Sequence, residues 1–310
     1  MQFNAATCTM RRESLCTRQR PQTKTRFMPS TRDSEISGKA TKRASARGAS
    51  ELALKPPLKW AGGKRWLAPI IRPYWQAHEH RRFVEPFCGG LAVALALRPR
   101  FALLNDANPH LINFYEWLKK PFPVTIEARN DETVYYTHRD RFNKLIKNGK
   151  RRSREAAQLF YYLNRTCFNG LCRFNQSGEF NVPFGTYAAN LRYAGDFDKY
   201  RALFRSWEFT NLDFEELEIA SDDFIYADPP YDVDFTAYSR GGFSWEDQTR
   251  AAEWLAAHPG PVILSNQATP RIKKLYKSLG FKLKFYDAPR RISCTGDRTM
   301  ACEVLAVKGL

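Results

Sequence analysis

The chain has 310 residues, of which 43% are hydrophobic and 26% charged, enough apolar material for one large core or a core with a smaller lobe. No stretch approaches eighteen consecutive apolar residues, so we expect no membrane-spanning helix. The formal net charge is +17, which is typical of a protein that faces a polyanion, either nucleic acid or an acidic membrane.

The basic charge is divided between the amino-terminal segment and the rest of the chain. Residues 1–50 hold 11 Lys and Arg but three acidic residues, and the remainder still carries +9. Residues 1–54 have few large apolar side chains, so we expect a disordered tail. Three interpretations stay open: an alternative upstream start, a basic arm for nucleic acid, or an organelle transit peptide.

Cysteine and histidine usage indicates a reduced protein without a metal site. The seven Cys form no C-x-x-C pair and no apolar signal-peptide core is present, which favours the cytoplasm. We expect Cys88, Cys294 and Cys302 to be buried small apolar residues. His78 and His80 in "HEH" are too close along the chain to share a metal ion readily, so a solvated position is predicted.

Seven apolar runs have the character of strands. Helical patterns separate most of them, at 89–97, 109–120, 246–258 and 270–279. This alternation predicts an α/β fold with a mainly parallel sheet, and the missing helix before the last run predicts an antiparallel strand there. The runs are residues 81–87, 101–108, 207–214, 223–230, 261–267, 281–289 and 302–310.

Residues 132–200 interrupt this rhythm between the second and third strands. They combine helical stretches with a polar and aromatic loop at 164–185. We interpret them as an inserted second lobe, placed where loops at a sheet edge carry function. The basic run at 147–154 is interpreted as a DNA-facing loop, with a merely solvated run as the alternative.

The first two strands end in residues suited to a nucleoside ligand. The glycines of "EPFCGG" (85–90) let backbone approach a ligand closely, and Asp106 follows the second strand, where it can accept hydrogen bonds from a ribose. The alternative for Asp106 is a helix N-cap. Because neither complete glycine-rich phosphate motif is present, a cofactor without a phosphate anchor fits better. In "LKWAGGKRW", Lys64 would neutralise a cofactor carboxylate, or it is a solvated turn residue.

The fourth strand ends in "ADPPYD" (227–232), which suits chemistry on the exocyclic amine of a base. Such an amine is a poor nucleophile because its lone pair is delocalised into the ring. A carboxylate and a prolyl carbonyl can both accept hydrogen bonds from the NH₂ group and localise that lone pair on nitrogen. A tyrosine can stack on a base held outside the duplex. A methyl donor in line with the nitrogen then suffices.

Six blocks occur in the order found in the Dam-type DNA N6-adenine methyltransferases, a family that the chain resembles over residues 56–308. D-P-P-Y alone is shared with N4-cytosine methyltransferases, whereas the six blocks together are specific. The resemblance implies a Rossmann-like methyltransferase sheet at 55–131 and 201–310, a mainly helical target-recognition domain at 132–200, and S-adenosyl-L-methionine as cofactor. The blocks are LKWAGGK, EPFCGG, NDANPHLINFY, YLNRTCFNGLCRFNQSGEFNVPFG, YADPPY and ISCTGDRTMACEVLAV.

The resemblance also assigns roles to residues. It implies that Asp228 serves both cofactor and target amine, that Pro229 supplies the carbonyl and that Tyr231 stacks on the base. Asp106 would bind the ribose, with further cofactor contacts from Trp60, Lys64, Glu85, Phe87 and Gly89. Arg173 would read a guanine, Leu171 and Pro183 would touch thymine methyl groups, and GATC is the implied site. The remaining DNA contacts would be Lys59, Phe168, Asn169 and Asn175.

The chain departs from the family pattern at three places. Leu91 stands where a further glycine is often found, Cys167 stands where an aromatic residue or glycine is expected, and the amino-terminal arm has no counterpart. Asp232 gains no role and is expected to be solvated.

The resulting hypothesis is a monomeric, cytoplasmic enzyme, associated with the nucleoid through DNA, that methylates adenine N6 in double-stranded DNA. Rival interpretations are methylation of cytosine N4 or of an RNA adenine, and a catalytically silent DNA-binding module. Mismatch marking, protection from phage and a restriction–modification partnership are all compatible with the sequence.

Overall fold

The computed structural model describes residues 54–186, 197–232, 242–288 and 301–310, which form one compact unit. The predicted amino-terminal tail and the segment around Cys294 lie outside these ranges. The elements are α2 (Ala68–Gln76), β1 (Phe83–Glu85), α3 (Ala92–Leu97), β2 (Ala102–Asn105), α4 (Pro109–Leu118), α5 (Glu132–Lys147), α6 (Arg154–Thr166), the 3-10 turn η1 (Phe168–Gly170), α7 (Asp198–Phe204), β3 (Trp207–Thr210), the 3-10 turn η2 (Phe214–Glu216), β4 (Phe224–Ala227), α8 (Trp245–Ala257), β5 (Val262–Gln267), α9 (Pro270–Ser278), β6 (Lys282–Ala288) and β7 (Ala301–Lys308).

The strands form one seven-stranded sheet in the order β3-β2-β1-β4-β5-β7-β6. The first five are parallel, and β7 pairs antiparallel with both β5 and β6. The predicted α/β fold and its antiparallel end are therefore confirmed. The last strand of the chain lies inside the sheet rather than at its edge, because it enters between β5 and β6.

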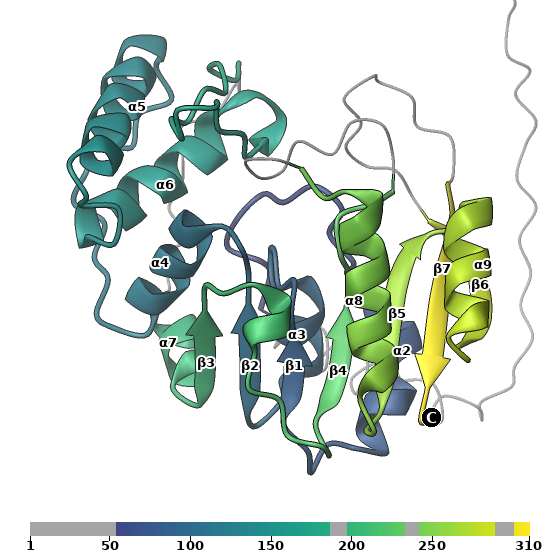
Figure 1. Ribbon diagram of the computed structural model, residues 1–310. Coiled ribbons are helices and arrows are strands. Elements are labelled where there is room, and N and C mark those ends of the chain that lie inside the picture. The colour runs from purple at the N-terminus through teal and green to yellow at the C-terminus, as the bar shows by residue number, and fades with distance from the viewer. Residues whose placement is uncertain (1–53, 187–196, 233–241, 289–300) are drawn as a thin grey trace, which may run out of the picture. The chain divides into compact units, whose positions relative to one another are not determined.

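The two faces of the sheet bury two sets of apolar side chains, as alternation along a strand requires. Phe83 and Leu104 face α2, α3 and α4, whereas Val84 and Leu103 face α8 and α9, which cover the other side of the sheet in Figure 1. Both faces are covered, which explains why β1, β2 and β4 are buried at every position.

Helices α5 and α6 lie in the chain between β2 and β3 and extend beyond the carboxyl ends of the strands (Figure 1). Ser153 caps the first turn of α6 through the amide of Ala156, and Asp131 caps α5 through Val134. Their buried aromatic side chains, such as Tyr135 and Phe160, continue the core that packs on β1 and β2. The division of the chain into two domains stays a prediction.

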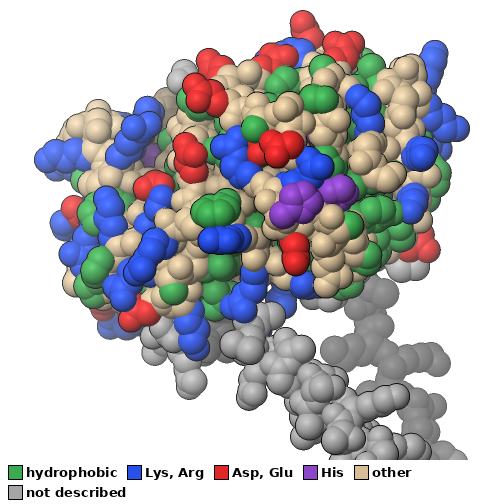
Figure 2. All heavy atoms as spheres, turned by 90° about the horizontal axis from the view of Figure 1, so that it is seen from below, with side chains coloured by type: hydrophobic (Ala, Val, Ile, Leu, Met, Phe, Trp, Pro, Cys, Tyr) green, Lys and Arg blue, Asp and Glu red, His purple; other side chains and the backbone are tan. Residues whose placement is uncertain are grey.

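A view from below shows the end of the sheet where the parallel strands begin (Figure 2). Basic and acidic side chains intermingle over the middle of this face. Arg82 forms an ion pair there with Asp223, which precedes β4, at an Nη2–Oδ2 distance of 2.6 Å. Within the described ranges, no helix is long and apolar enough to cross a bilayer, and no group of three or more His, Cys, Asp or Glu side chains is arranged to hold a metal ion.

Two expectations about single residues are wrong. Cys302 is exposed rather than buried, although the next two residues of β7, Glu303 and Val304, are both buried. Asp232 is also not solvated, as described below. Cys88 is buried as expected.

Candidate active site

Asp228 follows β4 directly and is held at the carboxyl end of the sheet by two side chains. Lys64 Nζ lies 2.8 Å from Asp228 Oδ2, and the hydroxyl of Ser265 on β5 donates to Asp228 Oδ1 at 2.8 Å. Lys64 is only 3% exposed, and its ammonium also donates to the carbonyl of Gly62. One oxygen of the Asp228 carboxylate thus contacts a cation, and the other accepts a hydrogen bond from a hydroxyl.

Tyr231 lies on the other side of Lys64. The ammonium is 4.5 Å from the centre of the Tyr231 ring, and the Tyr231 hydroxyl donates a hydrogen bond to Glu303 Oε1 on β7. Lys64 Nζ is 3.8 Å from the same Glu303 oxygen. Burial is the main cause of a raised pKa at Tyr231, followed by the negative charges of Asp228 and Glu303, so its hydroxyl stays a donor.

The two prolines are fixed by a buried polar network rather than by a surface turn. Gln248 of α8 donates from Nε2 to the carbonyl of Pro230 at 2.6 Å, and Asn266 of β5 donates to Gln248 Oε1 at 3.0 Å. Within the described part of the chain, no hydrogen bond is made to the carbonyl of Pro229. Among the described residues, the Pro229 carbonyl next to Asp228 therefore keeps its acceptor capacity.

The turn after β1 is tied to the end of β2. The amide of Gly89 donates to Asp106 Oδ2 at 2.9 Å, the amide of Asn108 donates to Asp106 Oδ1 at 2.9 Å, and the Tyr115 hydroxyl donates to the carbonyl of Gly89. Burial raises the pKa of Asp106 to about 6 against these two hydrogen bonds, which lower it. Asn108, not Asp106, caps α4, so the N-cap alternative for Asp106 is wrong.

Trp60 closes this turn from outside. A Cβ atom added to Gly89, which has φ of +43°, would lie 2.7 Å from Trp60 Nε1, and one on Gly90 would lie 2.8 Å from Trp60 Cβ. Glycine is needed here because no larger residue leaves room for the indole. Leu91, where the family often has glycine, adopts φ of +59° with its side chain fully buried. The backbone thus keeps a glycine-like turn with a leucine in it.

Glu85 and Phe87 lie beneath the turn. The Glu85 carboxylate is buried and accepts a hydrogen bond from the amide of Ala94 in the first turn of α3. Burial raises the pKa of Glu85 well above its usual value, opposed by that hydrogen bond and reinforced by the charge of Asp228. The Phe87 ring lies 5.5 Å from that of Phe214.

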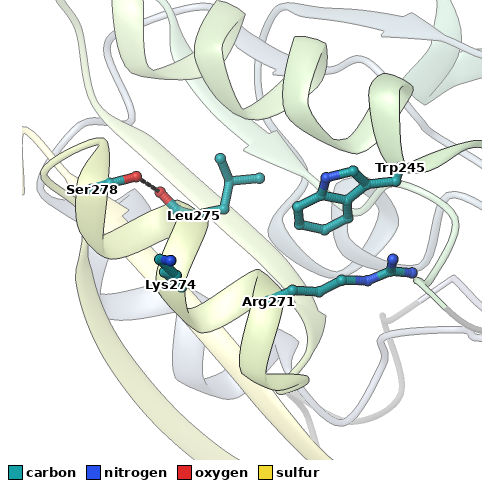
Figure 3. A pocket seen from close by; sticks show the side chains of 5 residues that line it. All are labelled: Trp245, Arg271, Lys274, Leu275 and Ser278. Atoms are coloured by element: carbon teal, nitrogen blue, oxygen red, sulfur yellow. Dashed lines mark hydrogen bonds between the residues drawn. The ribbon is translucent and has the colours of Figure 1, made fainter.

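Asp232 is buried and paired, which corrects the expectation that it is solvated. Its carboxylate is bound by the guanidinium of Arg271 on α9 and by the Thr269 hydroxyl at 3.3 Å. Arg271 also lies 4.6 Å from the ring of Trp245 on α8, and the two side chains face each other in Figure 3. They line a shallow depression of about 410 Å³ with Lys274, Leu275 and Ser278. Local sequence could not reveal this pairing, because the partner is 39 positions away.

The loop at 166–185 folds back on itself beyond α6. Phe174 pairs antiparallel with Phe180, and the Phe168 amide donates to the carbonyl of Pro183. Asn143 on α5 fixes the loop through both backbone groups of Phe180, at 3.1 and 2.8 Å. Phe168, Asn169 and Pro183 are exposed around the first turn of this hairpin, and Asn169 has φ of +52°.

Arg173 projects from the hairpin and is exposed. Its Nε donates to Asn181 Oδ1 at 2.9 Å and its Nη2 donates to the Asn181 carbonyl at 3.4 Å, so Asn181 holds one edge of the guanidinium. Asn175, in contrast, uses its amide within the turn: its Oδ1 accepts from the Glu179 amide and its Nδ2 donates to the Glu179 carboxylate. The geometry accounts for Asn175 as a turn residue, and its predicted DNA contact stays a prediction.

Lys59 joins the first segment to the hairpin. Its backbone exchanges two hydrogen bonds with the side chain of Asn164, each 2.8 Å long, and its ammonium donates to the carbonyl of Arg165 at 3.0 Å. A Cβ atom on Gly170 would lie 2.4 Å from Lys59 Cβ. Burial, with a smaller effect from Arg165, lowers the pKa of Lys59. Lys59 therefore lies beside the exposed turn of Phe168 and Asn169.

A basic turn connects α5 to α6. Lys150, Arg151 and Arg152 are exposed and form no ion pair with the acidic residues that the structure describes. Lys147 links this turn to the hairpin through an ion pair of 2.6 Å with Glu179. The predicted basic loop and the predicted reading hairpin are thus neighbours.

Comparison with known proteins decides the family. Residues 60–292 match the family described as D12 class N6 adenine-specific DNA methyltransferase. The chain is 36% identical over 87% of its length to a DNA N-6-adenine-methyltransferase of Escherichia phage P1, 34% identical over 81% to the Retron Ec67 DNA adenine methylase of Escherichia coli, and 36% identical over 81% to a DNA adenine methylase of Vibrio cholerae. It spans 37% of the phage protein, 90% of the retron protein and 94% of the Vibrio protein.

The chain belongs to the D12 class of N6 adenine-specific DNA methyltransferases. The resemblance inferred from the six sequence blocks is therefore confirmed.

For this D12-class chain, the structure gathers the predicted residues into two groups. Trp60, Lys64, Gly89, Asp106, Asp228 and Tyr231 lie at the carboxyl ends of β1, β2 and β4. Lys59, Phe168, Asn169, Leu171, Arg173 and Pro183 lie on or against the hairpin.

The sequence reasoning missed Glu303 and Ser265 in this D12-class site. The signal for Glu303 was a lone acidic residue inside the apolar run "CEVLAV", a position where an unpaired charge is costly. Ser265 carried no such signal, because a serine in a strand is common.

Proposed function

We propose that this chain methylates N6 of adenine in double-stranded DNA, with S-adenosyl-L-methionine as methyl donor. The observation that carries the proposal is the pair of acceptors at the end of β4: the Asp228 carboxylate, fixed by Lys64 and Ser265, and the adjacent carbonyl of Pro229. The family assignment supports adenine as the base and DNA as the substrate.

The two acceptors suit the two N–H bonds of the target amine. Hydrogen bonds to Asp228 and to the Pro229 carbonyl would draw the amine out of conjugation and leave its lone pair on nitrogen. Methyl transfer would form the new N–C bond and break the donor's methyl–sulfur bond, and the extra proton on N6 would pass to the Asp228 carboxylate. The Tyr231 ring would hold the base by stacking, which requires the adenine to leave the duplex.

The residues at the ends of β1 and β2 fit a nucleoside methyl donor. Each Asp106 oxygen accepts one backbone hydrogen bond and keeps a lone pair for a ribose hydroxyl. The Gly89 turn brings backbone close, with the Trp60 indole as an apolar wall. Lys64 holds a positive charge beside these groups, and Glu85 and Phe87 support the turn from below. When bound, the donor supplies a methyl group activated by a sulfonium.

The hairpin and the basic turn form the proposed DNA interface. The exposed guanidinium of Arg173 has five N–H donors, more than its two contacts with Asn181 use, and would suit guanine O6 and N7. Leu171 and Pro183 would offer apolar surface to thymine methyl groups. Lys150, Arg151 and Arg152 would contact phosphates. We propose GATC as the target sequence. We also propose that the protein acts as a monomer and that its DNA substrate places it at the nucleoid.

Plasmid protection tests this function. The full chain is expressed in a host without adenine methylation, and its plasmid is digested with one nuclease blocked by methylated GATC and one that requires it. Resistance to the first and cleavage by the second are expected. Cleavage of the plasmid by the first nuclease and resistance to the second would contradict the proposal.

A further inference from the structure

The last strand of the chain delivers a charged side chain into the site. β7 enters the sheet between β5 and β6, where Glu303 pairs in register with Gln267 and Tyr286. Glu303 is 5% exposed, its Oε1 accepts from the Tyr231 hydroxyl, and Lys64 Nζ is 3.8 Å from that oxygen. Its Oε2 is buried and has no hydrogen-bond partner in the described part of the chain.

Burying a carboxylate costs free energy unless the carboxylate is paired or hydrogen-bonded. Burial raises the pKa of Glu303, against the charge of Lys64 and the hydrogen bond from Tyr231, which lower it, and Asp228 adds to the rise. An apolar side chain would suit the surrounding strand residues Val304 and Leu305. The contacts of Glu303 with Tyr231 and Lys64 offer the reason for an acid here.

We propose that Glu303 is a positioning residue for methyl transfer, which acts by fixing the Tyr231 ring and by sharing Lys64 with Asp228. This inference rests on the proposed function. A hydrogen bond from the Tyr231 hydroxyl prevents the ring from turning about its side-chain bonds. Lys64 covers one face of that ring at 4.5 Å, so the target base stacks on the opposite face.

Glu303 also sets where the Lys64 charge lies. One ammonium serves two carboxylates, at 2.8 Å from Asp228 and at 3.8 Å from Glu303. Without Glu303, Asp228 is the remaining carboxylate partner of the Lys64 ammonium, which can then move away from the Tyr231 ring. The stacking residue and the catalytic acceptor would then lose their fixed relation.

A double-mutant cycle on the full-length protein tests the proposal. The variants are Tyr231→Phe, which keeps the ring, Glu303→Gln, which keeps the shape, and the two combined. A hydrogen bond to a charged group predicts a loss of about tenfold to hundredfold in the single-turnover methyl-transfer rate for each single variant. Both changes weaken the same contact, because Glu303→Gln removes its charge and Tyr231→Phe removes its hydroxyl donor. The double variant should therefore lose no more than the worse single variant, with the KM for DNA changed less than about twofold.

A buried acid on the same strand system provides the matched control. Asp223 is 2% exposed and pairs with Arg82 at the other end of β4, so Asp223→Asn should lower the unfolding free energy but leave the single-turnover rate of the folded protein unchanged. If Glu303→Gln does not fold, Glu303→Met, which conserves volume without charge, takes its place in the cycle.

Additive losses in the cycle, or a Glu303→Gln protein with the unchanged rate, would overturn the positioning role while the wild-type protein still methylates DNA. A wild-type protein that transfers no methyl group to DNA would instead refute the proposed function, and the inference with it.

Discussion

Lys64 Nζ lies 2.8 Å from Asp228 Oδ2, although the two residues are 164 positions apart in the chain. Lys64 stands in the first loop of the described fold, and Asp228 follows the fourth strand. The same ammonium meets the Tyr231 ring and the Glu303 carboxylate. One buried cation thus connects the segment before the sheet, the D-P-P-Y turn and the final strand.

Replacing Lys64 with Met should abolish most activity. The change leaves Asp228 and Glu303 as two neighbouring carboxylates without their shared cation, so we expect at least a hundredfold lower single-turnover rate. Quench-flow methyl transfer to duplex DNA measures it. Arg82→Met, which breaks the ion pair at the far end of β4, should reduce stability and not the rate. An equal loss of the single-turnover rate in both variants would show that Lys64 contributes only to stability.

Gly170→Ala should damage DNA binding through Lys59. The added methyl group would meet Lys59 Cβ at 2.4 Å, so either the hairpin or Lys59 must shift. We expect about tenfold weaker binding of a duplex containing the target, by fluorescence anisotropy.

Gly178→Ala is the control, because Gly178 has a similar positive φ of +76° and open space around its Cβ. It carries the backbone cost without the collision, so its affinity should stay near that of the wild type. The same loss in both variants would exclude the Lys59 contact as the cause.

Arg173→Ala should relax the choice of base. Loss of a bidentate guanine contact is worth about 1–3 kcal/mol of discrimination, so activity on the preferred site should fall while activity on sites with another base at that position is retained. Lys150→Ala, in the basic turn, should weaken binding to all sequences alike and reduce the salt slope by about one. An Arg173→Ala protein with unchanged sequence preference would remove the hairpin from the proposed reading role.

Asp106 should make stability depend on pH. Its pKa is about 6 in the folded protein against 3.8 as the ordinary value, so between these values the folded state binds more protons than the unfolded state. The contribution of Asp106 to the unfolding free energy is therefore present below about pH 4 and is lost as the pH rises through about 6. Urea unfolding across pH 4–7 measures this fall.

Asp106→Asn is the control for that pH effect. The amide has no charge to bury, so this part of the pH dependence should disappear, although one of the two backbone hydrogen bonds is lost as well. Cofactor binding by the wild type should tighten as Asp106 ionises near pH 6. If the unfolding free energy of both proteins depended on pH in the same way, Asp106 would not be the source of the effect.

Arg98→Gly should stabilise the protein by about 1 kcal/mol. Arg98 ends α3 with φ of +56° and ψ of +55°, a left-handed conformation that costs non-glycine residues about 1–2 kcal/mol. Lys274→Gly, at an exposed interior position of α9, should instead destabilise by about 1 kcal/mol. Thermal unfolding should therefore shift in opposite directions, and a lower melting temperature for Arg98→Gly would refute the argument.

The sheet was predictable because its strands are buried on both faces and alternate with helices. The runs that contain Glu85, Asn105 and Asp228 have the pattern of strands. They also contain or precede the residues that form the site at the carboxyl edge of the sheet. What sequence could not give was the pairing of distant elements. The position of β7 between β5 and β6 decides that Glu303 reaches Tyr231, and no local pattern encodes that order.

The same limit explains the errors on single residues. Asp232 was expected to be solvated because the sequence assigned it no role, yet Arg271 on α9 pairs with it. Leu91 stands where the family often has a glycine, yet its backbone adopts the left-handed conformation that glycine would take, and its side chain is buried in the core. A residue's type constrains its backbone less firmly than the surrounding packing does.

The central claim is most directly tested by base-resolved detection of methylated bases in DNA incubated with the purified full-length protein and S-adenosyl-L-methionine, beside an Asp228→Ala variant of confirmed fold. We expect methyl groups on adenine N6 at GATC with the wild-type protein and none with the variant. Methylated adenine in equal amounts with both proteins, or methylation confined to cytosine, would contradict it.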